Sequence, residues 1–127
     1  MESLQNELIT LRKKLAVLEN RNIAMKTQLA HILQYHFDRS LLDKLEYFNT
    51  TFLQQDTRVE ALRREMALQQ VWLSQASGNA DGDDTIRKHQ WLMQEKLYNM
   101  ETDVQQLTQS FSEYLQQHFP SVPKSPQ

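Results

Sequence analysis

Apolar residues return along the first quarter of the chain in alternating steps of four and three. This spacing runs without interruption over nine positions, and it places them on one narrow stripe of a helix. Such a stripe is typical of a helix that packs against another helix of the same kind. The N-terminal seam consists of Leu4, Leu8, Leu11, Leu15, Leu18, Asn22, Met25, Leu29 and Ile32, and we predict that it is the interface between copies of the chain.

The only polar residue in the N-terminal seam, Asn22, favours a parallel arrangement. The seam resembles a generic leucine zipper with Asn22 at an a position. Two Asn side chains can hydrogen-bond across a parallel two-stranded seam, whereas Asn opposite Leu would be buried without a partner. We therefore predict a parallel, in-register homodimer formed by a zipper helix over residues 2–37. Leucine at the other a positions leaves higher oligomers open.

Charges beside the seam agree in part with this register. In a parallel pair, each g residue meets the e residue five places further along in the partner. Two such pairs are attractive and one is repulsive: Glu7 with Arg12, Lys14 with Glu19, and Arg21 with Lys26. Exposed pairs contribute only about 0.2–1 kcal/mol, so they select orientation more than they add stability.

A second apolar stripe lies on the opposite side of the same helix, at b and c positions. Its members include Ile9, Ala16, Val17 and Ile23. These positions face water in a two-stranded zipper, so they predict a docking face for another helical protein. The alternative is a scatter of single apolar residues, which is normal on protein surfaces.

The junction after the zipper has two interpretations. Leu29, Leu33, Phe37, Leu41 and Leu45 are spaced by four, and no Gly or Pro interrupts them. This spacing predicts a continuous helix whose seam rotates. The alternative is a new helix that begins at an N-cap, either Asp38 or Ser40.

The remainder of the chain predicts an antiparallel helical hairpin over residues 38–119. Two apolar seams, over 41–73 and 86–118, flank a loop at 77–83 that holds both glycines. Asp83 or Asp84 would cap the second helix. Two zippered copies would then form a four-helix bundle, so the predicted fold is all-α. Residues 120–127 hold all three prolines of the chain and predict a disordered tail.

Folding at that loop brings aromatic residues together at the open end of the hairpin. Equal lengths on both sides predict these neighbours: Leu62 with Met100, Val59 with Val104, Phe52 with Phe111, Phe48 with Tyr114, and Trp72 with Trp91. Phe37 would lie beside this end. We predict that the aromatic cluster of Phe37, Phe48, Phe52, Phe111 and Tyr114 is core; a ligand groove is the alternative.

Composition excludes several classes of function. The net charge of −2 is too balanced for nucleic acid or an anionic membrane as the main partner. A basic-zipper DNA-binding protein would need a long basic helix before the leucines, and only Met1 to Ser3 precede Leu4. The chain has no Cys and no apolar run long enough to span a bilayer. We therefore expect a soluble protein of the cytoplasm.

No catalytic or cofactor signature stands out. The loop imitates the first half of an EF-hand, but Lys88 occupies the position of the closing bidentate Glu, so we expect no metal. We expect no enzyme, no cofactor, and a scaffold, adaptor or assembly subunit that acts through helix faces. The alternative is a regulator or chaperone-like clamp that binds a client helix or small ligand at the aromatic end of the hairpin.

Overall fold

The chain folds into three long helices. The computed structural model describes residues 2–76 and 83–120. Its elements are α1 (Glu2–Tyr35), the 3-10 helix η1 (Arg39–Leu41), α2 (Leu42–Gln75) and α3 (Asp84–His118). The described residues contain no strand, so the predicted all-α class is confirmed. The helices are long because no Gly or Pro occurs before residue 78 or within α3.

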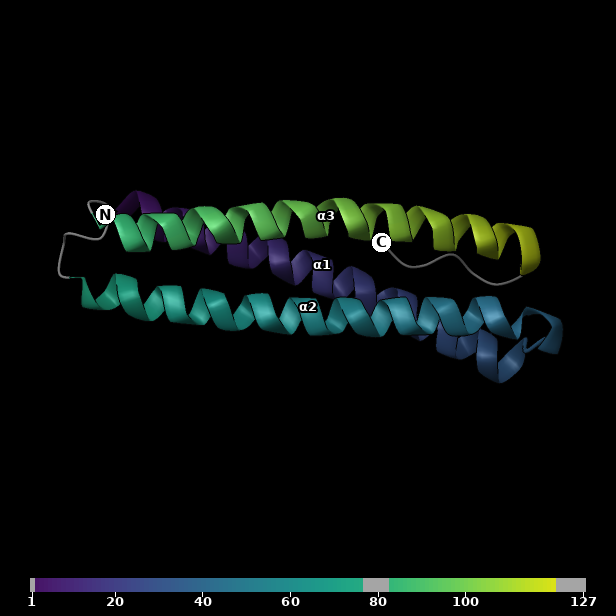
Figure 1. Ribbon diagram of the computed structural model, residues 1–127. Coiled ribbons are helices and arrows are strands. Elements are labelled where there is room, and N and C mark those ends of the chain that lie inside the picture. Colours follow the sequence, from purple (N-terminus) through teal and green to yellow (C-terminus); the bar gives the residue numbers. More distant parts are fainter. Residues whose placement is uncertain (1, 77–82, 121–127) are drawn as a thin grey trace.

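The three helices lie alongside one another. Figure 1 shows α2 and α3 running in opposite directions, with α1 crossing behind them. The beginning of α1 lies near the beginning of α3, and its end lies near the beginning of α2 (Figure 1). Helix α1 contacts both α2 and α3. The first helix therefore folds back against its own hairpin.

The junction between α1 and α2 is a turn. The last bond of α1 runs from the amide of His36 to the carbonyl of Ile32, at 2.9 Å. Asp38 is extended, with φ −132°, and its Oδ1 accepts hydrogen bonds from the amide and hydroxyl of Ser40. The predicted continuous helix is therefore wrong, and of the two candidate caps Asp38 is the one used. The reversal lets the apolar seams of α1 and α2 bury each other within one chain.

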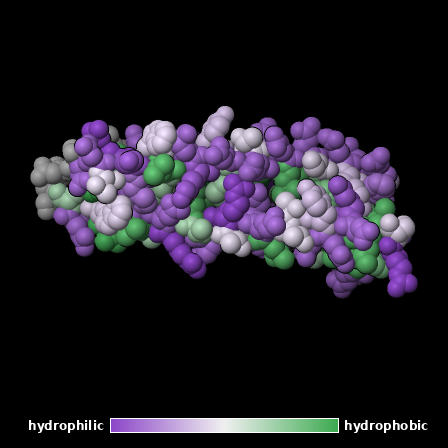
Figure 2. All heavy atoms as spheres, in the orientation of Figure 1, coloured by the Kyte–Doolittle hydropathy of each residue, from purple (hydrophilic) through white to green (hydrophobic). Residues whose placement is uncertain are grey.

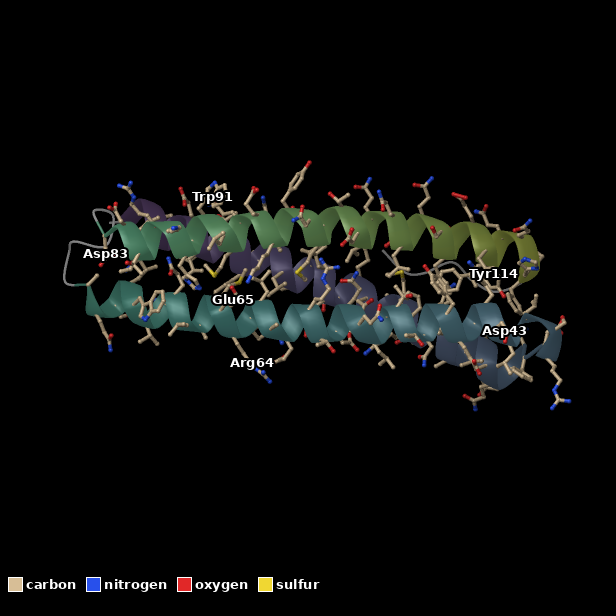
Figure 3. All side chains as sticks on the ribbon, viewed as in Figure 1. Asp43, Arg64, Glu65, Asp83, Trp91 and Tyr114 are labelled. Atoms are coloured by element: carbon tan, nitrogen blue, oxygen red, sulfur yellow. The ribbon has the colours of Figure 1, made fainter. Side chains whose placement is uncertain are left out.

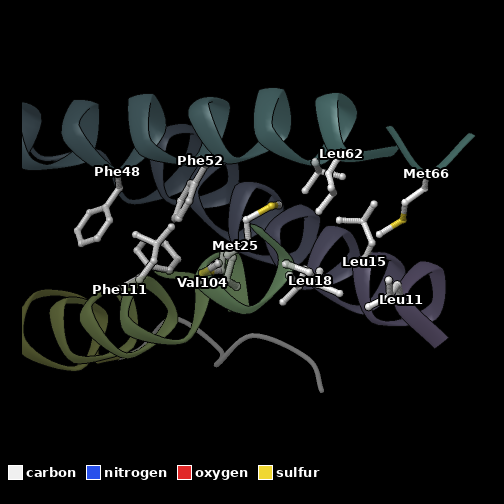
Figure 4. Packing of buried hydrophobic residues seen from close by; sticks show 14 of the residues in the cluster. Leu11, Leu15, Leu18, Met25, Phe48, Phe52, Leu62, Met66, Val104 and Phe111 are labelled. Carbon is white, nitrogen blue, oxygen red and sulfur yellow. The ribbon is translucent and has the colours of Figure 1, made fainter. Parts of the chain in front are cut away.

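The core is built from the seams of all three helices. Figure 4 shows Leu11, Leu15, Leu18 and Met25 of α1 in one cluster with residues of α2 and α3. The apolar members of the N-terminal seam, from Leu4 to Ile32, are all buried. The predicted homodimer interface is thus part of the core of a single chain in this conformation. A seam of period 3.5 requires helical partners, and α2 and α3 supply them in place of a second copy.

Helix α3 begins at Asp83, one of the two caps expected from the sequence. Oδ1 of Asp83 accepts hydrogen bonds from the amides of Thr85 and Ile86, at 2.9 and 3.2 Å. Asp84 lies in the first turn, where its charge favours the helix dipole. The predicted loop at 77–83 and tail at 120–127 lie mostly outside the described residues.

Candidate protein-interaction surface

The predicted partner face of α1 points away from the core. Ile9, Ala16, Val17 and Ile23 are all exposed, and the three larger side chains keep between 46% and 55% of their area. Ile9, Ala16 and Ile23 recur every seven residues, as does Ala30, which is also exposed. A spacing of seven keeps these side chains on one line along a helix that winds around its neighbours. This line forms the exposed α1 stripe: Ile9, Ala16, Ile23 and Ala30.

Two large aromatic side chains of α3 are also exposed. Trp91 and Tyr98 are seven residues apart and keep 57% and 66% of their area. Figure 3 shows Trp91 on the side of α3 that faces away from α2. Sequence periodicity alone did not single out this pair, since both residues lie off the α3 seam.

Trp91 does not lie beside Trp72 in the way the sequence predicted. Trp72 instead packs on the ring of His89, with 4.9 Å between centroids. Trp91 follows His89 by two residues, which places its side chain on a different face of α3. That prediction was wrong because it matched distance from the loop without matching the helix face.

The grooves between helices are open to solvent, and both polar and apolar side chains line them. The one that contains Tyr98 lies between α1 and α3 and measures about 530 Å³; its rim includes Glu7, Lys14, Glu95 and Glu101. Within residues 2–76 and 83–120, no three His, Asp or Glu side chains gather closely enough to hold a metal ion. On the face seen in Figure 2, hydrophilic residues predominate and the apolar ones form small separate areas.

A polar contact inside the bundle joins α1 to α2. Asn22 is buried, and its Nδ2 donates hydrogen bonds to the carbonyl of Phe52 at 2.9 Å and to Oδ1 of Asp56 at 2.7 Å. The other carboxylate oxygen of Asp56 pairs with Lys26. Oδ1 of Asn22 is buried without a hydrogen bond. Asn22 therefore finds its partner on α2, whereas the sequence predicted a second Asn22.

A polar layer near the N-terminus of α1 links all three helices. Gln69 and Gln90 are buried, and Nε2 of Gln69 donates to Oε1 of Gln90 at 2.8 Å. Nε2 of Gln90 donates in turn to the carbonyl of Leu4 and to Oε1 of Glu7. Nδ1 of His89 lies 2.7 Å from Oε1 of Gln69. This layer fixes the position of α1 along the hairpin, because sliding α1 would leave the buried amide of Gln90 without its partners on α1.

His89 lies at the edge of this layer. Its pKa is lowered because burial disfavours the charged imidazole. The carboxylate of Glu65, 4.0 Å from Nε2, acts in the opposite direction, and nearby Lys96 adds to the lowering. Glu65 itself is paired with Lys96 at 2.8 Å. Figure 3 shows Glu65 on the side of α2 that faces α3.

The aromatic cluster is mostly core, as predicted. Phe52 and Phe111 meet edge to face with centroids 5.1 Å apart, and Phe48 lies 5.3 Å from Tyr114. All four rings are buried. Burial raises the pKa of the Tyr114 hydroxyl, with a smaller contribution from Asp38. Phe37 is the exception: it is 52% exposed in the α1–α2 turn, because the chain reverses there.

The predicted charge pairs of the zipper are replaced by pairs between helices of one chain. Glu19 pairs with Arg63, and this contact raises the pKa of the guanidinium. Lys26 pairs with Asp56, and Glu7 accepts from Gln90 and Gln94. Between α2 and α3, Arg58 pairs with Asp103. These contacts lie at the edges of the buried seams, where flanking charges of coiled coils are found.

Comparison of the chain with protein-family models, curated proteins and solved structures finds no match. In the part of the chain that the structure describes, no helix combines the length and apolar character needed to cross a bilayer.

Proposed function

We propose that this chain is a non-enzymatic protein-interaction module, a scaffold, adaptor or assembly subunit that presents helix faces to another helical protein. The observation that carries the proposal is the exposed α1 stripe, with apolar residues every seven positions on a helix whose other face is already buried. A period of seven on an exposed surface suits a fourth helix laid along α1.

The rest of the surface supports the same class of function. The exposed aromatic pair Trp91 and Tyr98 also recurs with a spacing of seven. Large aromatic side chains are enriched at the centres of protein interfaces, because they bury much area at a small entropic cost. Rigid long helices hold such side chains at fixed distances, which is what an assembly subunit requires.

Site-specific photocrosslinking tests this proposal. A photoreactive amino acid replaces Ile9 or Ile23 in the full chain within its source cells, and crosslinked partners are identified and purified. We expect the purified partner to bind the wild-type chain and to lose at least about tenfold in affinity with Ile9→Lys/Ile23→Lys, since two buried apolar anchors are removed.

The matched control replaces Arg64, which lies on the outer side of α2 and is 79% exposed at its side chain. Far-ultraviolet circular dichroism confirms that each variant keeps its helices. Equal crosslinking from position 64, or unchanged affinity for the double lysine variant, would contradict the proposal.

A further inference from the structure

We infer that α1 can exchange between two copies of the chain. In the exchanged form, the N-terminal seam of each copy packs on α2 and α3 of the other copy. In this form the α1–α2 turn straightens, and α1 of each copy packs on the hairpin of the other. The result is a domain-swapped homodimer with an antiparallel pair of long helices. The inference is independent of the exposed α1 stripe.

The turn between α1 and α2 has the composition of a helix. Residues 36–41 contain neither Gly nor Pro, and the same is true of every residue from 1 to 77. The turn is held by the Asp38 cap, by a hydrogen bond from the amide of Leu41 to the carbonyl of Asp38, and by the last bond of α1. These hydrogen bonds oppose straightening of the turn. They involve few groups, and Asp38 itself is exposed. Short connections of this kind are the usual site of domain swapping.

Apolar side chains at the turn are left half-exposed by the reversal. Leu33 and Phe37 keep 39% and 52% of their area. Together with Leu41 and Leu45 they are spaced by four, which places them on one face if the helix continues through the turn. In the closed chain Leu45 is buried and Leu41 packs on the core, so Leu33 and Phe37 are the part of this stripe that stays uncovered.

The contacts between α1 and α2 have the symmetry that exchange needs. Lys26 and Asp56 lie 15 residues on either side of position 41, and Glu19 and Arg63 lie 22 residues on either side. The bonds from Asn22 to Phe52 and to Asp56 are centred on positions 37 and 39. If all these contacts are kept between two antiparallel copies, the two-fold axis passes between positions 37 and 41, within the turn. The exposed side chains of Leu33 and Phe37 then lie beside the same segment of the second copy and become covered.

Exchange costs little, because each copy recovers the contacts it gives up. The buried seam of α1, the bond from Asn22 to Asp56 and the bonds from Gln90 to Leu4 and Glu7 all form again between copies. The balance then depends on the turn, on the burial of Leu33 and Phe37 and on the protein concentration.

Crosslinking tests the exchange, because the natural chain has no Cys. One preparation carries Lys26→Cys and another carries Asp56→Cys. They are mixed in urea, refolded together at about millimolar concentration and treated with a short bismaleimide. We expect a product of twice the chain mass, since exchange brings the two thiols together. The control, Lys26→Cys with Arg64→Cys, should give none, because Arg64 points away from α1 (Figure 3).

A hinge substitution makes the test specific. Arg39 is the first residue of η1 and follows the extended Asp38, which is a favourable place for proline. Arg39→Pro should leave the closed monomer intact but weaken the dimer by at least roughly 100-fold, because proline interrupts a helix interior. Arg39→Ala, the matched control, should leave the dimer in place.

The results that would overturn the exchange of α1 differ from the results that would contradict the proposed function. A chain that remains monomeric after refolding at millimolar concentration overturns the inference. A dimer that gives no crosslink between positions 26 and 56, or that resists Arg39→Pro, also overturns it. Ile9→Lys/Ile23→Lys, which tests the exposed α1 stripe, should leave the exchange unchanged.

Discussion

The side-chain amide of Asn22 on α1 donates a hydrogen bond of 2.7 Å to Asp56 on α2, 34 residues further along the chain. The same amide reaches the carbonyl of Phe52. The one polar residue of an otherwise apolar seam therefore has its hydrogen-bond partners within the same chain. The contact sets the register between α1 and α2, because a shift by one turn would bury Asn22 against apolar residues.

Asn22→Leu should stabilise the folded chain by about 1 kcal/mol. The substitution removes a buried acceptor that has no hydrogen bond and adds apolar burial. Asp56 keeps its pairing with Lys26 and is partly exposed, so it is not left as a buried unpaired charge. Urea denaturation measures the change. The exposed Asn20→Leu serves as control, with an expected effect within about 0.5 kcal/mol. A loss of stability in Asn22→Leu would show that the polar contact outweighs apolar burial.

Phe52→Ala should destabilise the chain by about 3–5 kcal/mol. The ring is fully buried and contacts Phe48 and Phe111, so its removal leaves a cavity. The neighbouring Leu53 is half-exposed, and Leu53→Ala should change stability by less than about 1 kcal/mol. Equal effects of the two substitutions in urea denaturation would contradict the packing of this end of the bundle.

Gln90→Ala should loosen the first turns of α1. Gln90 donates to the carbonyl of Leu4 and accepts from Gln69, so its loss removes a tie between α3 and α1 and costs about 1–3 kcal/mol. Hydrogen exchange should become faster for the amides of residues 4–11, while those around Phe52 and Phe111 change less. Gln109→Ala, at an exposed position, should leave the whole pattern as it is.

Acid should weaken the bundle through His89. The folded chain holds the pKa of His89 below its ordinary 6.5, because burial disfavours the charged ring. The unfolded chain therefore binds more protons below about pH 6.5, and the free energy of unfolding falls as the pH drops from there through the folded-state pKa. Urea denaturation over this range should show a shallower pH dependence for His89→Gln than for wild type.

A direct titration of the His89 ring by nuclear magnetic resonance separates this group from the other histidines. A midpoint at or above 6.5 would contradict the effect of burial. A pH dependence that His89→Gln leaves unchanged would assign the acid effect to other groups.

Periodicity predicted much of the secondary structure and of the hairpin. The seams of α2 and α3 and the pairing of Phe52 with Phe111 follow from apolar spacing and from equal helix lengths about a loop. The capping preference of Asp limited the start of α3 to Asp83 or Asp84, and the structure uses Asp83. The aromatic cluster without Phe37 was also predicted correctly. Polar residues that hydrogen-bond across the core, such as Gln90, were not predicted, because a buried Gln at a seam position looks like an interruption of the apolar pattern.

The amino-acid sequence by itself determined three amphipathic helical stretches and which face of each must be covered, because those faces follow from residue spacing alone. Only the tertiary structure decided what covers the first one. A seam of period 3.5 fits any helix with a matching seam, whether it belongs to another copy or to the same chain. The turn at Asp38 resolves that choice here: it brings α2 and α3 to α1 within one molecule, at the high effective concentration of a covalent neighbour.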